Sequence, residues 1–237
     1  MILSILLQAS TDLGTTIAPT IDTAVEANKN LPKGTWELIL TGGFVMIPIF
    51  VMLIIAIFIT IERTLTISKS GKLDANFMSS IKDMVLNDNI LGAKTLCGRT
   101  DTPIARMLEK GISRIGNPLK NIEVAVENVG KLEVYKLERG MPWLATIAGA
   151  APMLGFLGTV TGMITTFRSI AEAGDQVSAG ALSGGIYEAM VTTVAGLVVG
   201  ILGYLAYNLL TASIEKVVYK MEATSVEFLD ILQAPAN

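Results

Sequence analysis

Three long apolar stretches divide the chain into parts that suit a lipid bilayer and parts that suit water. The first is apolar from Phe44 to Ile61 except for Thr60 and a proline at position 48. About 20 mainly apolar residues are enough for a helix to cross the hydrocarbon core of a bilayer. The pattern therefore predicts an all-α membrane protein with three transmembrane helices, at residues 36–61, 142–170 and 184–211.

The segment between the first two stretches, residues 62–141, mixes charged and apolar positions. Its apolar residues recur at steps of three and four, as on one face of a helix, at Leu119, Ile122, Val126 and Val129. This spacing predicts a helical domain outside the membrane. Residues 1–35, rich in threonine and broken by two prolines, are expected to form a leader outside the membrane, and residues 212–237 to form a tail.

The distribution of positive charge predicts the orientation of the chain. Most of its 18 lysines and arginines lie within residues 62–141. Cytoplasmic loops of membrane proteins carry such an excess. We therefore expect residues 62–141 and 212–237 to be cytoplasmic, and the leader 1–35 and the loop 171–183 to lie on the opposite side of the membrane, in a multi-pass membrane protein.

Composition argues against an enzyme. The 237 residues are 51% hydrophobic and 16% charged, with no histidine and one cysteine, Cys97. The absence of histidine excludes Ser-His and Cys-His catalytic pairs and most zinc ligand sets. We expect no catalytic residues, no metal site, no cofactor and no nucleic-acid partner, and we expect Cys97 to be a small buried residue.

Small residues are spaced for close helix contact in the second and third apolar stretches. Glycines four residues apart allow two backbones to approach in lipid, where the hydrophobic effect gives no drive for association. We expect these faces to join identical subunits into a closed ring. The packing positions are Pro152, Gly155, Gly158, Gly162, Gly196 and Gly200.

Polar side chains accompany the glycines at membrane depth. Glu188 is the only charged residue in its apolar stretch, and a charge at mid-bilayer costs about 2.5 kcal/mol or more, so Glu188 should face protein or water. Helical spacing predicts that Thr192 is its neighbour. Thr159, Thr166, Thr192 and Thr193 together would give a hydroxyl-lined passage, repeated around the axis of a ring.

Each polar residue also has an interpretation without function. An isolated threonine in a membrane helix satisfies its hydroxyl on its own backbone. Glu188 would complement the positive end of its own helix if it lay in the first turn. The glycines would serve helix packing alone.

Two segments resemble the signatures of the ExbB/TolQ/MotA proton-channel family, closest to ExbB or TolQ. They are Ala151-Pro-Met-Leu-Gly-Phe-Leu-Gly-Thr-Val-Thr-Gly and Gly185-Ile-Tyr-Glu-Ala-Met-Val-Thr-Thr-Val-Ala-Gly-Leu. The resemblance extends over nearly everything after about residue 36. It implies that Thr159, Glu188 and Thr193 face a proton pathway and that Pro152 kinks the second helix. Helical spacing adds Thr192 to the pathway.

The resemblance also implies partners. Members of this family form a ring, pentameric in the ExbB branch, around single-span proteins of the ExbD/TolR type, whose membrane aspartate carries protons. The expected function is that of a ring subunit of a motor, driven by the proton-motive force, that acts through a TonB-like periplasm-spanning protein on outer-membrane transport. The resemblance further implies that the ring is surrounded by lipids of the bacterial inner membrane, with the leader 1–35 and the loop 171–183 in the periplasm.

Three rival interpretations remain open at this stage. The first is a TolQ-like subunit of the Tol-Pal envelope system. The second is a scaffold that anchors a periplasmic protein without conducting, in which the polar groups only bond between helices. The third is a MotA-like flagellar stator, against which the three predicted spans argue, because that branch typically has four.

Overall fold

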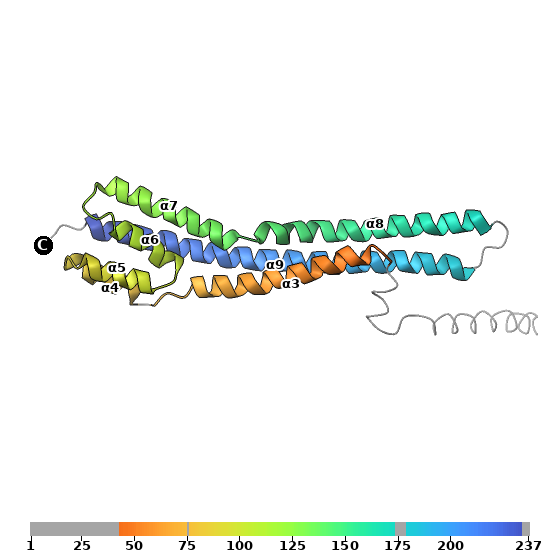
Figure 1. Ribbon diagram of the computed structural model, residues 1–237, viewed down its shortest axis with the longest axis horizontal. Coiled ribbons are helices and arrows are strands. Elements are labelled where there is room, and N and C mark those ends of the chain that lie inside the picture. Colours follow the sequence, from red (N-terminus) through yellow and green to blue (C-terminus); the bar gives the residue numbers. More distant parts are fainter. Residues whose placement is uncertain (1–42, 75, 174–178, 234–237) are drawn as a thin grey trace, which may run out of the picture.

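The computed structural model describes residues 43–74, 76–173 and 179–233 and is helical wherever it has regular structure. The leader 1–35, the expected start of the first membrane helix at residue 36 and part of the loop 171–183 lie outside the described residues. Figure 1 shows an elongated bundle in which long helices fill one end and short helices gather at the other. The fold therefore has two parts along its length, one built from long helices and one that also contains the short helices.

Three helices of the described chain carry stretches long and apolar enough to cross a membrane. They lie in α3 (Met46–Ser70), in α8 (Met141–Ala173) and in the first part of α9 (Ala179–Gln233). Large apolar side chains on these helices are exposed, for example Phe58 at 69% and Phe156 at 67%. In water such surfaces would be costly, but in a bilayer they match the lipid. The predicted all-α membrane protein with three spans is confirmed.

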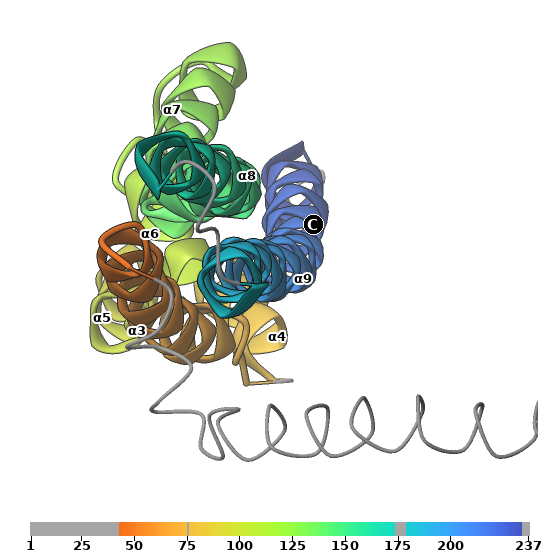
Figure 2. The ribbon, with the colours of Figure 1, turned by 90° about the vertical axis from the view of Figure 1, so that its right-hand side faces the viewer.

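Helix α9 is the longest helix of the described residues and contacts both the long and the short helices. Its 55 residues extend about 80 Å at 1.5 Å per residue, more than twice the thickness of the hydrocarbon core. Its first part packs against α3 and α8, and its last part packs against α4, α6 and α7 (Figures 1 and 2). A single rigid helix thus joins the membrane half to the rest of the protein.

The short helices form a second core around the last part of α9. They are α4 (Phe77–Leu86), α5 (Ile90–Arg99) and α6 (Pro103–Ile112), followed by the longer α7 (Leu119–Glu138). The hydroxyl of Thr102 caps α6 by accepting from the amide of Ala105, with Pro103 at the favoured first position. Phe228 of α9 is fully buried against Val126 of α7 and Gly111 of α6. These four helices and the last part of α9 therefore share one buried core.

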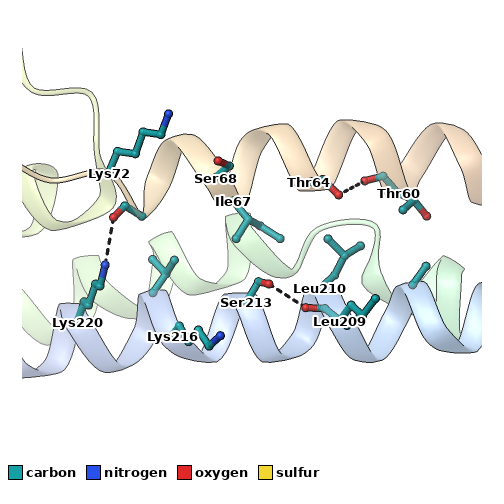
Figure 3. A pocket seen from close by; sticks show the side chains of 13 residues that line it. Thr60, Thr64, Ile67, Ser68, Lys72, Leu209, Leu210, Ser213, Lys216 and Lys220 are labelled. Carbon is teal, nitrogen blue, oxygen red and sulfur yellow. Dashed lines mark hydrogen bonds between the residues drawn. The ribbon is translucent and has the colours of Figure 1, made fainter.

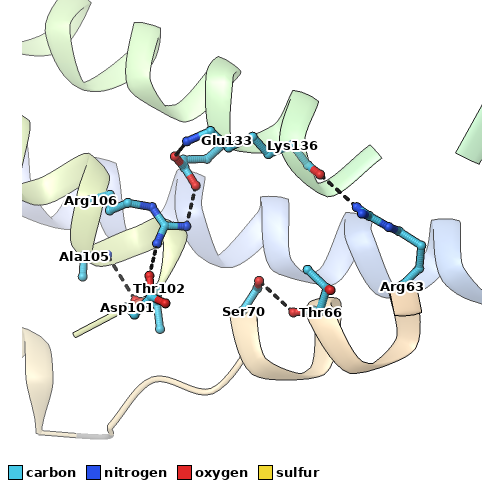
Figure 4. Close-up of polar contacts among 9 residues, drawn as sticks. All are labelled: Arg63, Thr66, Ser70, Asp101, Thr102, Ala105, Arg106, Glu133 and Lys136. Carbon is cyan, nitrogen blue, oxygen red and sulfur yellow. Dashed lines mark hydrogen bonds and ion pairs between the residues drawn. The ribbon is translucent and has the colours of Figure 1, made fainter. Parts of the chain in front are cut away.

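Arg63 ties the first membrane helix to the corner between α7 and α8. Arg63 is 7% exposed, and its guanidinium pairs with Glu62 at 2.6 Å. The guanidinium also donates to the backbone oxygen of Lys136 at 3.0 Å (Figure 4). That oxygen belongs to the last turn of α7, where a positive charge complements the helix dipole. Gly140, with φ at +88°, then makes the turn into α8. The Glu62-Arg63 pair fixes a joint between helices.

A second charged cluster stabilises the helical domain. The carboxylate of Glu133 is 3% exposed and accepts from Arg106 and Lys136, both at 2.6 Å (Figure 4). Burial alone would raise the pKa of Glu133, but the hydrogen bonds and charges of Arg106 and Lys136 hold it below its usual range. Glu133 therefore stays ionised and joins α6 to α7.

Cys97 is buried, as expected. Its side chain is 1% exposed, and burial raises the pKa of its thiol to about 12, with the charge of Glu109 adding to the effect. A thiol that is neither exposed nor ionised reacts slowly with thiol reagents.

Candidate functional site

The second and third membrane helices meet along a seam of glycines. A Cβ at Gly196 would lie 2.5 Å from the backbone oxygen of Ala151 and 2.9 Å from the Cα of Gly155. A Cβ at Gly155 would in turn lie 3.0 Å from the backbone oxygen of Thr192. Backbone atoms cannot give way as a flexible side chain does, so only glycine allows this approach of α8 and α9.

The seam continues in both directions along the two helices. Toward the start of α8, Gly200 leaves room for the ring of Pro152, whose Cγ would be 2.5 Å from an added Cβ. Toward its end, Gly162 faces Ala189, with 2.9 Å between the two Cβ positions. Gly158 receives the side chain of Thr192. All five glycines of the predicted packing set thus lie between α8 and α9 of the same chain.

This position corrects the expectation that the glycine faces join subunits. Gly155, Gly158, Gly162, Gly196 and Gly200 are covered within one chain. A surface already occupied inside the protomer is not available to a neighbour, so contacts between copies must use other faces.

Thr193 links the two helices by a hydrogen bond. Its hydroxyl donates to the backbone oxygen of Gly155 at 3.0 Å. Thr159, half-buried on α8, donates to the backbone oxygen of Phe156 at 2.6 Å. The oxygen that Thr193 contacts belongs to Gly155, one helical turn before Thr159. Each hydroxyl oxygen keeps acceptor capacity for water or a donor.

Thr192 lies inside the seam. Its side chain is 2% exposed, and its hydroxyl donates to the backbone oxygen of Ala189 at 2.7 Å and more weakly to that of Glu188 at 3.3 Å. The predicted contact between Thr192 and Glu188 therefore runs to the backbone of Glu188. The hydroxyl of Thr192 is satisfied within its own helix and packed against Gly158.

The Glu188 carboxylate points toward α3. Its Oε1 lies 2.2 Å from the position that a Cβ would take at Gly43, a glycine with φ at +64° just before α3 begins. The positive end of the α3 dipole favours a carboxylate there. Because α9 begins at Ala179, Glu188 lies beyond the first turn of its own helix. The interpretation that it complements its own helix does not hold.

Thr166 belongs to the same seam. Its side chain is 6% exposed, its hydroxyl donates to the backbone oxygen of Gly162 at 2.8 Å, and its Oγ1 lies 2.1 Å from the position of a Cβ at Gly185. The resemblance did not single it out. Thr166 is one of the four threonines that the sequence alone suggested for a hydroxyl-lined passage, and its spacing of four residues from Gly162 places it on the glycine face of α8.

The described residues hold no group of three or more His, Cys, Asp or Glu side chains that could bind a metal. What the seam offers is hydroxyl groups, backbone oxygens and one carboxylate at membrane depth. Groups of these kinds accept and donate hydrogen bonds to water.

Comparison with known proteins assigns the chain to a family. The sequence model of the MotA/TolQ/ExbB proton channel family matches residues 99–223, which include α6, α7, α8 and most of α9. The chain belongs to the MotA/TolQ/ExbB proton channel family. All four residues predicted to line a proton pathway, and the whole glycine seam, fall within the matched segment.

The relatives include proteins named ExbB and proteins named TolQ. An ExbB-like biopolymer transport protein of Synechocystis sp. is 30% identical over 175 residues, 73% of this chain and 69% of the relative. Biopolymer transport protein ExbB of Neisseria meningitidis serogroup B is 27% identical over 189 residues, 72% of this chain and 84% of the relative. Tol-Pal system protein TolQ of Pseudomonas aeruginosa is 35% identical over 100 residues, 42% of this chain and 43% of the relative. The predicted family is confirmed.

We predict that Gly155→Leu separates α8 from α9. A side chain there meets the backbone of Thr192, Thr193 and Gly196, and overpacking of this kind costs about 1–3 kcal/mol or more. The detergent-solubilised variant should unfold at a lower temperature, measured by circular dichroism.

Gly149→Leu on the same helix is the matched control, because an added Cβ at Gly149 meets nothing described within 4 Å apart from its chain neighbours and the backbone of its own helix. Equal unfolding temperatures for the two variants would contradict the seam as the stabilising contact.

Proposed function

We propose that this protein is the ring-forming subunit of a motor in the bacterial inner membrane that is driven by the proton-motive force. The observation that carries the proposal is the polar seam within the family-matched segment, where the Thr193 hydroxyl donates to the backbone oxygen of Gly155, one helical turn before Thr159. Its residues offer acceptors for water along the inside of a helix pair. The membrane potential stores about 2.3 kcal/mol per charge per 100 mV, which a proton crossing such a pathway would release.

The proposal includes partners of stated chemistry. The candidate pathway has hydroxyls and Glu188, and the three predicted spans contain no aspartate. A single-span ExbD/TolR-like protein with one membrane aspartate would supply the titrating group. The ring, expected to be a pentamer, would surround this partner and act through a TonB-like protein on outer-membrane transport. Similarity to ExbB of Neisseria over 72% of the chain favours this branch.

The TolQ-like function in the Tol-Pal system is the second candidate, favoured by 35% identity to the TolQ of Pseudomonas over 100 residues. The ExbB-like and the TolQ-like function differ in the periplasmic protein that the motor would act on. Co-purification of the partners with the tagged full chain separates them.

A third candidate, the non-conducting scaffold, is favoured by the Thr193 hydrogen bond itself, because that bond joins two helices. It predicts that the polar groups matter for assembly and for nothing else. Variants that remove hydrogen bonding while keeping shape distinguish the scaffold from the motor.

We predict that Thr159→Val, Thr193→Val and Glu188→Gln each abolish energy transduction while leaving the complex assembled. Valine keeps the shape of threonine and deletes the hydroxyl, so the seam keeps its packing and loses its polar lining. Complex recovery is measured beside proton-dependent uptake or envelope activity in cells.

Thr161→Val is the matched control. Thr161 is exposed on the same helix, about 200° around from Thr159, and its hydroxyl donates to the backbone of Leu157 and Gly158. Full activity in the three test variants would contradict the proposed proton pathway. Loss of assembly in these variants would favour the scaffold.

We also propose that residues 62–141 and 212–237 are cytoplasmic and that the leader 1–35 and the loop 171–183 are periplasmic, supported by the lysines and arginines of the helical domain. The native Cys97 is too buried to report on this. Leu91, 79% exposed on α5, is a suitable site for an introduced thiol.

We predict that Leu91→Cys in a Cys97→Ser background reacts with a membrane-impermeant maleimide only after the cells are broken. Labelling of intact spheroplasts, with the outer membrane removed, would reverse the orientation. The Cys97→Ser chain without a new cysteine measures background labelling.

A further inference from the structure

The last part of α9 has an exposed apolar face that the membrane does not explain. Tyr219 is 72% exposed and Val226 is 60% exposed, seven residues apart and thus on the same side of the helix. Both lie beyond the end of the apolar stretch near Leu210, among charged residues. The opposite side of α9 is buried in the helical domain through residues such as Met221 and Phe228. The Tyr219 face therefore meets water unless another molecule covers it.

Charges of opposite sign flank this face at the same level along the axis of α9. At 100° per residue, Glu215 and Glu222 lie on one side of Tyr219, and Lys216 and Lys220 lie on the other. All four are exposed, and none forms an ion pair with another described residue. We call these the acidic edge and the basic edge of α9.

Neighbouring helices extend both edges. Beside the acidic edge, a groove of about 570 Å³ between α7 and α9 is lined by Glu222 together with Glu123, Glu127 and Glu138. Its one lysine, Lys131, is paired with Glu127 at 2.7 Å. The groove thus adds further negative charge on the side of Glu222.

Beside the basic edge, a groove of about 570 Å³ between α3 and α9 is lined by Lys72, Lys216 and Lys220 (Figure 3). Lys220 also donates to the backbone oxygen of Gly71 at 3.3 Å. Asp74 and Glu227 lie with Lys220 around a third groove, further along α9. At the height of residues 215–222 the sign is therefore negative on one side of α9 and positive on the other.

A membrane restricts how two copies of this chain can meet. Every copy is inserted in the same direction, so α9 helices of neighbouring copies run parallel with equal residues at equal height. Like edges would then repel, and the acidic edge of one copy would meet the basic edge of the next. Each contact leaves one acidic and one basic edge free, and such head-to-tail contacts continue until a ring closes.

We propose that the last part of α9 is the contact between neighbouring copies of this chain, with Glu215 and Glu222 of one copy facing Lys216 and Lys220 of the next around Tyr219 and Val226. This inference rests on the homo-oligomer of the proposed function. It places the contact outside the membrane, away from the glycine seam. The edges set the order and direction of the copies, and the apolar face contributes area.

The experiment exchanges the charges of the two edges in the full chain. Lys216→Glu/Lys220→Glu and Glu215→Lys/Glu222→Lys each place like charges together at every contact, whereas all four substitutions restore opposite charges with the edges exchanged. Native mass measurement in detergent should show each double variant assembling about tenfold or more less readily than the original chain. The quadruple variant should recover the ring.

Two controls accompany the exchange. Lys94→Glu/Lys110→Glu changes net charge equally at exposed positions of α5 and α6 and should leave the ring intact. Lys216→Glu alone keeps the hydrogen bond of Lys220 to Gly71, and helical content by circular dichroism verifies that each variant is folded.

Unchanged assembly of both double variants would overturn the proposal, as would a folded quadruple variant that stays dissociated. If the lysine variant kept its ring and lost binding to vesicles of anionic phospholipid, the basic edge would be a lipid headgroup site and the proposal would be wrong. Proton-dependent activity is a separate readout, so a ring that assembles by this rule without conducting would refute the proposed function alone.

Discussion

The close approach of α8 and α9 is the contact on which the rest of the structure depends. Lipid gives apolar helices no reason to associate, so backbone contact must come from surfaces that fit. Gly155 and Gly196 bring the two backbones close enough for the Thr193 hydroxyl to reach across to Gly155. The same approach seals Thr192 between the helices. Packing and polar lining are thus two results of one geometry.

The sequence was sufficient for the three apolar helices and the family, because each depends on local patterns of apolar, charged and small residues. It could not tell whether the glycines pair helices within a chain or between chains, since the spacing is the same in both cases. Nor could it place the carboxylate of Glu188 beside Gly43, about 145 residues away, or the guanidinium of Arg63 against the α7–α8 corner. Such contacts depend on tertiary packing, and α9 brings the distant segments together.

The length of α9 gives the proposed motor a mechanical consequence. Glu188 and Thr193 lie near one end of an unbroken helix whose other end carries Phe228 in the core of the helical domain. A rotation or tilt of the membrane part would be carried to the last part as a rigid movement. Contacts between copies at Tyr219 would then couple the protomers, while the seam within each protomer would remain unchanged.

The central claim is that protons cross the membrane along this ring when a partner supplies a titrating group. Proton flux into liposomes under an applied potential tests it most directly, with the chain reconstituted alone and with a co-purified single-span partner. The account predicts that flux requires both proteins and disappears when the partner's membrane aspartate is replaced by asparagine. Flux from the assembled complex no higher than that of empty liposomes would contradict it.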